Sequence, residues 1–365
     1  MKMSKKIVVA SDSFKGTLSS LDICSLFKNE LKNDELCLLP IADGGEGSLE
    51  AISNILSGHF VDVEVNDLYF QKRKVRFFVD DNKNAYVETA SCAGLTLAKK
   101  DNTPGKTTTF GLGEQIKKAI ELGYKTIYVF LGGSATNDGG VGLASALGVK
   151  FFNKQNEPFV PTGLTLKDIV RIDCTKSNEL LKGINIIALS DVQSPFYGLE
   201  GAAYKFAPQK GASKEEVVLL DEGLRYLAEV ANVPNVAGAG AAGGLGGGLL
   251  TFAHANIRSG INSILDLIKF DNAINYADLV ITGEGKLDKQ TLDGKVIDGV
   301  AKRCLKANKP LIIIVGISEL SFEEIQNKYP CVKAIFETNY KHLPFEEIKK
   351  TAKEDYINVI KNLEL

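Results

Sequence analysis

Two glycine-rich segments of this chain carry hydroxyl, amide and carboxylate side chains directly after apolar runs. The first segment is GGSATNDGG at residues 132–140, and it follows the apolar run TIYVFL at 126–131. The second is GEGKLD at 283–288, and it follows LVIT at 279–282. In open α/β sheets, ligands bind outside the carboxyl ends of the strands. Both segments are therefore predicted to be ligand-binding loops for phosphate and metal.

The first segment offers several partners to a phosphate group. Hydroxyl and amide groups come from Ser134, Thr136 and Asn137, and Gly133 adds a backbone N–H. A helix is predicted to begin near Val141, and exposed N–H groups before a helix favour an anion. An ordinary glycine turn with a helix cap would explain one polar residue, but not four within five positions.

The second segment combines two carboxylates with a cation. Glu284, Lys286 and Asp288 are spaced so that all three can face one magnesium phosphate group. Mg²⁺ is usually held by one or two carboxylates together with phosphate oxygens. This segment is therefore predicted to bind the metal and part of the phosphate.

Two loops near the start of the chain carry similar residue types. SDSFKG holds Asp12, Ser13 and Lys15 directly after an apolar run, where a lysine can meet an anion and a carboxylate can meet a metal or a hydroxyl. ADGGEG holds Asp43 beside two glycines that let the backbone approach a ligand closely. A solvated turn is the alternative interpretation of each loop, and the residues alone leave it open.

Two residues in the middle of the chain could also act on a ligand. Asp191 leaves the apolar run INIIALS at 184–190, where a carboxylate can serve as a general base or a metal ligand. Capping of the next turn is the alternative. Lys210 in PQKG offers a mobile cation, although a loop lysine is usually just solvated.

Composition restricts the class of ligand. The chain has 365 residues and a formal charge of −2, with no basic stripe, so nucleic acid and anionic membrane are not expected as partners. A small molecule is expected instead. The six cysteines are scattered and form no CxxC motif, which is typical of reduced thiols. With no signal peptide and no apolar run of 18 residues, the protein is predicted to be cytoplasmic.

The order of the elements predicts two domains. The chain opens with two β-loop-α units and closes with the same parallel rhythm, whereas 59–88 shows the alternation of an antiparallel meander. We therefore predict an α/β fold in which both chain ends build one doubly wound, mainly parallel Rossmann or flavodoxin-like domain, residues 1–58 and 271–365. A second α/β domain with a mixed sheet, residues 59–270, is inserted in the middle.

Three apparent motifs lack the context that they need. GAGAAG at 238–243 fits the dinucleotide fingerprint, but no buried strand precedes it, so a flexible or closely packed loop is expected there. The Gly105-Lys106-Thr107 sequence lacks the first glycine of a P-loop. The three histidines form no pair at helical spacing, which argues against a zinc hydrolase.

The motifs together resemble the bacterial-type glycerate kinase family. The matching blocks run in the family's order: SDSFKG, LPIADGGEG, VETASCAGL, TTTFGLGE, GGSATNDGG, SDVQSP, GAAYKFAPQKGA, GAGAAGGLGGG, IRSGI and ITGEGKLDKQTLDGK. The chain departs from the common pattern at Ser190, Ser194 and Ala207, while Asp191 and Lys210 are retained. The resemblance implies phosphorylation of D-glycerate to 2-phosphoglycerate with ATP and Mg²⁺, in a cleft between two α/β domains.

The resemblance also suggests a role for each candidate residue. A carboxylate would take the proton of the substrate hydroxyl, with Asp191 as first choice and Asp43 as its rival. The metal would be bound by Glu284 and Asp288, with Asp43 as a further candidate. Cations would shield phosphate charge, and a bidentate arginine would hold the substrate carboxylate. The remaining roles fall to Lys15 as a catalytic cation, to Arg258, Ser13 and Lys210 at the substrate, and to Gly133, Ser134, Thr136, Asn137 and Lys286 at the ATP phosphates.

Other functions stay open at this point. A kinase of another small hydroxy acid would keep the phosphate loops, and a glycerate kinase could form 3-phosphoglycerate instead. A non-catalytic hydroxy-acid sensor would bind the acid without turning ATP over. The 238–248 stretch is expected to act as a hinge or liner during closure of the two domains. A monomer or a homodimer is expected.

Overall fold

The computed structural model describes residues 4–292 and 294–363. The chain forms two compact units. One comprises Met1–Asp43, Glu50–Leu56 and Ser259–Leu365 and is called the terminal unit here. The other comprises Gly44–Leu49 and Ser57–Arg258 and is called the central unit.

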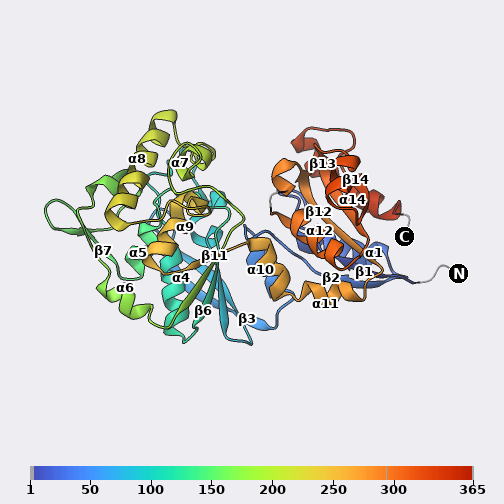
Figure 1. The fold of residues 1–365 in the computed structure, drawn as a ribbon, viewed down its shortest axis with the longest axis horizontal. Helices are drawn as coiled ribbons and strands as arrows, with labels where there is room; N and C mark the ends of the chain where they lie inside the picture. The colour runs from blue at the N-terminus through green and yellow to red at the C-terminus, as the bar shows by residue number, and fades with distance from the viewer. Residues whose placement is uncertain (1–3, 293, 364–365) are drawn as a thin grey trace. The chain divides into compact units, whose positions relative to one another are not determined.

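The terminal unit contains a five-stranded sheet in the order β14-β13-β12-β1-β2, with every neighbouring pair parallel (Figure 1). In chain order of the unit's own strands this is a flavodoxin-like arrangement, whose switch point lies between the first and third strands. The parallel sheet from both chain ends is therefore confirmed. Its strands are β1 (Lys6–Val9), β2 (Glu35–Leu38), β12 (Leu279–Leu287), β13 (Leu311–Ser318) and β14 (Val332–Glu337).

Helices pack around this sheet because its strands are apolar on both faces. Helix α1 begins at a capping box in which Ser19 and Asp22 exchange side-chain and backbone hydrogen bonds. Helix α14 lies against α1, and its Tyr356 ring meets Phe14 and Phe27 edge-on at 5.3 and 6.1 Å. The helices are α1 (Ser20–Glu30), α10 (Gly260–Leu267), α11 (Phe270–Asn275), α12 (Val296–Lys306), α13 (Phe322–Lys328) and α14 (Phe345–Lys361), with the 3₁₀ turn η4 (Lys289–Leu292).

Strand β12 is longer than the sequence predicts. The GEGKLD segment was expected to be a loop, but β12 continues through it to Leu287. The physical reason is backbone pairing, since Glu284 is in register with Val315 of β13 and Leu287 with Ser318. Glu284 and Lys286 therefore extend from a strand that is held by hydrogen bonds, and not from a loop.

The central unit contains a six-stranded mixed sheet in the order β11-β10-β6-β5-β4-β3. Strands β3, β4 and β5 form the predicted antiparallel meander, while β5, β6, β10 and β11 are parallel. The predicted mixed sheet is thus confirmed. Its strands are β3 (Gly58–Asn66), β4 (Lys72–Asp80), β5 (Asn84–Glu88), β6 (Thr126–Phe130), β10 (Asn185–Leu189) and β11 (Asn256–Arg258).

Shorter elements complete the central unit. A small antiparallel sheet joins β7 (Lys150–Phe152) to β8 (Pro158–Phe159) and β9 (Arg171–Asp173). Helix α2 (Ser48–Ser53) spans a boundary between the units in the chain. The other helices are α3 (Ala90–Ala93), α4 (Phe110–Glu121), α5 (Val141–Ala146), α6 (Thr175–Leu180), α7 (Ala202–Phe206), α8 (Lys214–Ala231) and α9 (Ala241–Phe252), with the 3₁₀ turns η1 (Leu95–Leu97), η2 (Gly163–Asp168) and η3 (Pro208–Lys210).

The glycine run at 238–248 is closely packed, as one of the two interpretations of it predicted. Its end forms part of helix α9, after left-handed backbone angles at Ala242, Gly243 and Gly244 that interrupt the helix. Its backbone lies directly on the GGSATNDGG segment. A Cβ atom at Gly243, where φ is +73°, would lie 2.0 Å from the Thr136 carbonyl oxygen, and one at Gly248 would lie 2.5 Å from that of Gly139. Only glycine permits this backbone-to-backbone contact. The run therefore supports the segment from behind.

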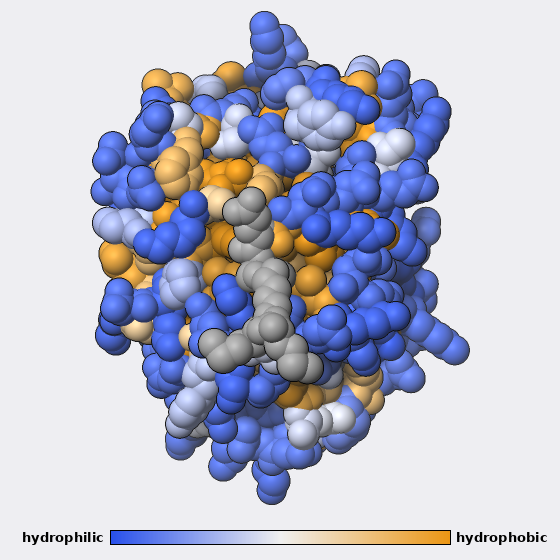
Figure 2. Space-filling model, turned by 90° about the vertical axis from the view of Figure 1, so that its right-hand side faces the viewer, coloured by the Kyte–Doolittle hydropathy of each residue, from blue (hydrophilic) through white to orange (hydrophobic). Residues whose placement is uncertain are grey.

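The surface is that of an ordinary α/β protein. Figure 2 shows a face of the molecule on which hydrophilic residues predominate and hydrophobic residues appear between them. Scattered exposed apolar residues are normal on folded proteins. Among the residues that the structure describes, no helix has both the length and the apolar character needed to cross a membrane.

Asp138 joins two helices of the central unit from a fully buried position. Its Oδ2 accepts hydrogen bonds from the Thr109 backbone N–H (2.8 Å) and hydroxyl (2.8 Å) and from the Gly142 N–H (3.2 Å). Its Oδ1 accepts one from the Gly140 N–H (3.0 Å). Burial raises the pKa of Asp138, and these four hydrogen bonds act against that rise. The carboxylate thus fixes the starts of α4 and α5 next to the GGSATNDGG segment.

Replacing Asp138 by asparagine is expected to destabilise the central unit by about 2–4 kcal/mol. The amide would place an NH₂ group against N–H donors that now meet a carboxylate oxygen, which leaves buried donors unpaired. Urea unfolding followed by circular dichroism measures the loss. The exposed Asp62→Asn on β3 is the matched control and should change little. Equal stability of the Asp138 variant and its control would contradict this role.

Candidate active site

The switch point of the terminal sheet brings distant parts of the chain together. Beyond the paired residues of β1 and β12, the Asp12 N–H donates to the Gly283 carbonyl oxygen at 2.9 Å, and the Ser11 hydroxyl reaches the same oxygen at 3.1 Å. Asp12 therefore lies beside Glu284. One step across the sheet, Glu284 is in register with Val315, whose carbonyl oxygen accepts from the Thr338 N–H. Strand ends from both halves of the chain thus form one edge.

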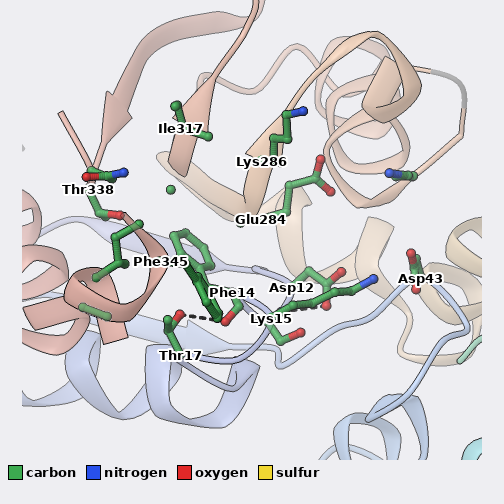
Figure 3. A pocket seen from close by; sticks show the side chains of 17 residues that line it. Asp12, Phe14, Lys15, Thr17, Asp43, Glu284, Lys286, Ile317, Thr338 and Phe345 are labelled. Carbon is green, nitrogen blue, oxygen red and sulfur yellow. Dashed lines mark hydrogen bonds between the residues drawn. The ribbon is translucent and has the colours of Figure 1, made fainter. Parts of the chain in front are cut away.

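A pocket of about 360 Å³ opens at this edge. Three carboxyl groups line it, those of Asp12, Asp43 and Glu284 (Figure 3). Burial raises the pKa of Asp12 to about 8, and the nearby charges of Asp43 and Glu284 add to the rise. Burial likewise raises the pKa of Glu284 to about 7. Like charges that converge with so little water are relieved by protonation or by a bound cation.

An unpaired oxygen atom supports the same conclusion. Oε1 of Glu284 is buried and has no hydrogen-bond partner within the described part of the chain. Buried polar atoms are almost always paired, so this oxygen fits a ligand such as a metal ion. Across residues 4–292 and 294–363, no three His, Cys, Asp or Glu side chains lie close enough to hold a metal by themselves. Magnesium bound to a polyphosphate needs only one or two carboxylates, because phosphate and water supply the other ligands.

Lysine side chains line the same pocket. Lys15 is exposed and extends past Asp12 in Figure 3. Lys295 is the N-cap residue of α12, so the start of a helix adds its partial positive charge. Lys286 also lines the pocket, but it forms an ion pair with Glu319 at 2.8 Å, which raises its pKa. The pocket can therefore hold a metal and phosphate groups side by side.

Asp288, which was expected to bind the metal, is engaged within the chain. Its Oδ1 accepts hydrogen bonds from the Thr291 N–H at 3.0 Å and hydroxyl at 3.3 Å. Its Oδ2 lies 3.7 Å from Lys286 Nζ. Burial alone would raise the pKa of Asp288, but the bonds from Thr291 and the charges of Lys295 and Lys286 lower it. Asp288 closes the turn after β12 and is not among the residues that line the pocket.

The central unit has its own edge of parallel strand ends. A hollow of about 140 Å³ there is lined by Gly133, Ser134 and Lys210, among others. Gly133 adopts a left-handed φ of +77°, and its neighbour Gly132 packs so closely on Gly45 that a Cβ would lie 2.3 Å from the Gly45 Cα. The glycines of this segment are thus required by its close contact with the ADGGEG loop.

Lys210 is buried at the base of this hollow. Its Nζ donates to the Ser134 hydroxyl at 2.9 Å and to the Thr136 carbonyl oxygen at 2.8 Å. Burial lowers the pKa of Lys210 to about 7, although the negative charge of Asp138 opposes the change. The expected mobile loop cation is in fact a fixed amine. An anion bound in the hollow would restore its charge.

Thr136 and Asn137 lie fully buried behind the hollow. The Thr136 hydroxyl and both polar atoms of the Asn137 amide have no hydrogen-bond partner among the described residues. Three such atoms on adjacent residues are unusual, because an unpaired buried polar atom costs about 1–3 kcal/mol. Bound ligand or water is the ordinary way to satisfy them.

Asp191 and Arg258 follow adjacent strands at the same edge. The Ser190 N–H donates to the Arg258 carbonyl oxygen at 3.0 Å, so the ends of β10 and β11 lie side by side. Asp191 is half-buried and Arg258 is exposed. Burial raises the pKa of the nearby Tyr128 phenol, and the positive charge of Arg258 opposes that rise. The central edge thus combines a carboxylate, an arginine, a buried lysine and hydroxyls.

The predicted site residues therefore divide between the two units. Ser13, Lys15, Asp43, Glu284 and Lys286 line the pocket of the terminal unit, and Asp288 lies beside it. The central unit holds the other predicted residues, which are Gly133, Ser134, Thr136, Asn137, Asp191, Lys210 and Arg258.

Sequence reasoning did not select several residues that the structure places at these edges. Asp12, in the SDSFKG loop, lines the terminal pocket. Thr338 follows β14 and lines the terminal pocket. Glu88 ends β5 in the central unit, and its carboxylate accepts from the Gly47 N–H at 2.9 Å. Burial raises the pKa of Glu88 to about 7. The strand-end rule that found Asp191 would also have found Thr338 and Glu88.

The fold and the two edges define the class of the protein. A doubly wound α/β unit with carboxylates and lysines at its switch point, and a second α/β unit with anion-type groups at its edge, are the parts of a phosphotransferase. The chain belongs to the glycerate kinase family, because the sequence profile described as "Glycerate kinase family" matches residues 7–364. The prediction that it is a kinase of this family is confirmed.

Individual relatives agree over nearly the full chain. A glycerate kinase of Bacillus cereus is 38% identical, with 98% of this chain and 97% of the relative aligned. A glycerate 2-kinase of Escherichia coli is 37% identical over 85% of each chain. A crystal structure from Salmonella typhimurium LT2, assigned as a glycerate kinase 2, is 35% identical with a TM-score of 0.82 over 98% of this chain and 97% of that one.

The low pKa of Lys210 predicts a specific pH dependence of stability. Because the folded-state pKa is about 7 and the ordinary value is 10.5, the unfolded chain binds more protons between these two pH values. The free energy of unfolding of the native protein, relative to Lys210→Met, should therefore rise by about 2 kcal/mol from pH 7 to pH 9. Urea unfolding of both proteins at each pH measures this difference.

The control for this test is Lys205→Met on α7, which removes an exposed lysine from a neighbouring helix. For this variant the difference from the native protein should be nearly the same at both pH values. If the difference for Lys210→Met were also the same at both pH values, the amine of Lys210 would have an ordinary pKa, which would contradict its enclosure beside Ser134 and Thr136.

Proposed function

We propose that this protein transfers the γ-phosphoryl group of ATP to D-glycerate and forms 2-phosphoglycerate. The observation that carries the proposal is the meeting of three carboxylates and several lysines at the switch point of the terminal sheet. Such a pocket is suited to a metal-bound polyphosphate. Membership of the glycerate kinase family supports glycerate as the acceptor of the phosphoryl group. A glycerate 2-kinase among the relatives supports the 2-position.

The terminal pocket is the proposed site of Mg-ATP. One or two of Asp12, Asp43 and Glu284 would hold Mg²⁺, and Glu284 contributes its unpaired Oε1. Asp288 would act from beside the pocket by holding Lys286 in place. When bound, the metal neutralises charge that develops on the phosphate oxygens. Besides the metal, the side chains of Lys15, Lys286 and Lys295 would add positive charge near the phosphates.

The central edge is the proposed site of the acceptor. Arg258 would bind the substrate carboxylate through its planar fork of donors, together with the buried amine of Lys210. Asp191, at the end of the adjacent strand, would accept the proton of the 2-hydroxyl group as the hydroxyl oxygen attacks phosphorus. Asp43 is the alternative base.

The GGSATNDGG segment would stabilise the phosphoryl group during its transfer. Gly133, Ser134, Thr136 and Asn137 offer a backbone N–H, hydroxyls and an amide to its oxygens, and the unpaired atoms of Thr136 and Asn137 support this role. Ser13 is proposed to contact the acceptor.

In-line transfer requires donor and acceptor to meet, so the proposal includes a reaction cleft that receives groups from both units. Closure of this cleft would exclude water and prevent loss of ATP by hydrolysis. An enzyme that uses ATP and a small organic acid is proposed to work in the cytoplasm, as a monomer or a homodimer.

The proposal predicts release of ADP from Mg-ATP that depends on D-glycerate. L-Glycerate, glycolate, lactate and tartronate serve as comparison acceptors, and phosphorus NMR of the product distinguishes 2- from 3-phosphoglycerate. Removal of a general base costs about 10²- to 10⁴-fold in rate, so Asp191→Asn should lose at least a hundredfold in kcat while Asp62→Asn retains full activity. No turnover with any acid, or an Asp191→Asn variant at the native rate, would contradict the proposal as stated.

A further inference from the structure

The terminal pocket is larger than a metal and three phosphates require. Its charged groups gather toward one end, where Asp12, Lys15, Asp43 and Glu284 lie in Figure 3. Toward the other end the labelled side chains are Phe14, Ile317, Thr338 and Phe345. This second end, called the apolar end here, has no role in the phosphate chemistry described above.

Helix α14 supplies much of the apolar end. Phe345, Ile348 and Ala352 are spaced three and four residues apart, so they share one face of the helix, and all three line the pocket. Phe14 forms part of the wall from the opposite side, with its ring edge against Tyr356 in the core at 5.3 Å. The apolar end is therefore built from a rigid helix and a core aromatic ring.

Phe345 stands out because it is a large aromatic side chain that is 48% exposed beside a charged site. It lies against the SDSFKG loop, where a Cβ at Gly16 would come within 2.8 Å of its Cζ atom. The positive φ of +79° at Gly16 gives the loop the shape that admits the ring. The tip of the Phe345 ring is thus held by the loop, and Lys349 Nζ lies over the ring at 4.7 Å from its centroid. A flat ligand would stack on the ring face that Lys349 leaves open, or would displace this flexible lysine.

Thr338 adds one polar group to these apolar walls. The residue is 8% exposed, its N–H is bonded to the Val315 carbonyl oxygen, and its hydroxyl has no hydrogen-bond partner among the described residues. The neighbouring Asn339 is already engaged, because its side chain exchanges hydrogen bonds with the backbone of Leu343 at 2.9 and 3.2 Å. Asn339 holds the turn before α14, and Thr338 is left to contact a ligand.

We propose that the apolar end binds the base of the nucleoside triphosphate, with Phe345 as its stacking partner and the Thr338 hydroxyl as a hydrogen-bond partner of its edge. This inference rests on the proposed function, since it needs the phosphates at the carboxylate and lysine end. Aromatic rings stack on bases of any identity. A three-carbon hydroxy acid has almost no apolar surface and cannot use these walls. The nucleotide therefore extends along the pocket of the terminal unit.

Direct binding of Mg-ADP and of magnesium tripolyphosphate, measured by calorimetry without any acceptor, tests the inference. Both ligands carry phosphates, but only ADP has a base. Phe345→Ala is expected to weaken Mg-ADP about tenfold and to leave tripolyphosphate within twofold. Thr338→Val, which keeps the side-chain shape, should weaken Mg-ADP about fivefold.

Phe322→Ala is the matched control, because Phe322 also opens a helix, is 37% exposed and does not line the pocket. It should bind both ligands as the native protein does. Equal weakening of both ligands by Phe345→Ala would show that the ring only shapes the phosphate end, and no weakening would place the base elsewhere. Both results overturn the inference. Selective loss of Mg-ADP would uphold it even if no acid were phosphorylated, which would refute the proposed function alone.

Discussion

The terminal unit depends on the pairing of β1 with β12, two strands that lie 272 residues apart in the chain. Ile7, Val8 and Val9 pair with Leu279, Val280 and Ile281, and the Thr282 hydroxyl and Ser11 hydroxyl add bonds across the same seam. This pairing creates the switch point, and it alone brings the SDSFKG loop to Glu284. Without it Glu284 would remain apart from Asp12 and Asp43, which lie at the other end of the chain.

The central unit uses a different device, which is backbone packed on backbone. Glycines of α9 lie against Thr136 to Gly140 so closely that no side chain fits between them, and Asp138 holds the same segment through four hydrogen bonds. Because the segment is fixed from behind and from within, its remaining polar groups cannot turn to one another. The unpaired atoms of Thr136 and Asn137 are the consequence. Rigidity here leaves these buried atoms without partners among the described residues.

Sequence pattern was sufficient for the arrangement of strands and for most residues at the edges, because apolar runs and the polar residues directly after them are local features. Sequence pattern could not show which polar side chains are buried. Lys210 in PQKG looks like any loop lysine, and only the packing around it shows that its amine is enclosed. Nor could the pattern show that Asp288 is engaged by Thr291 and Lys286. Phe345 belongs to the pocket only through the packing of α14, which no local pattern contains, whereas Thr338 follows a strand and is within reach of the strand-end rule.

The candidate sites of the two units bury charges of opposite sign. In the terminal unit, burial and mutual repulsion oppose ionisation of Asp12 and Glu284, and in the central unit burial opposes protonation of Lys210. Each unit therefore carries a cost that an ordinary core would avoid, and each cost is removed by a ligand of the complementary charge. A ligand that binds only the folded state also stabilises it by mass action. The unfavourable electrostatics of the unliganded protein thus lie where we propose that ligands bind: the metal ion of a metal-bound nucleotide at the carboxylates of the terminal unit, and an organic anion at Lys210 of the central unit.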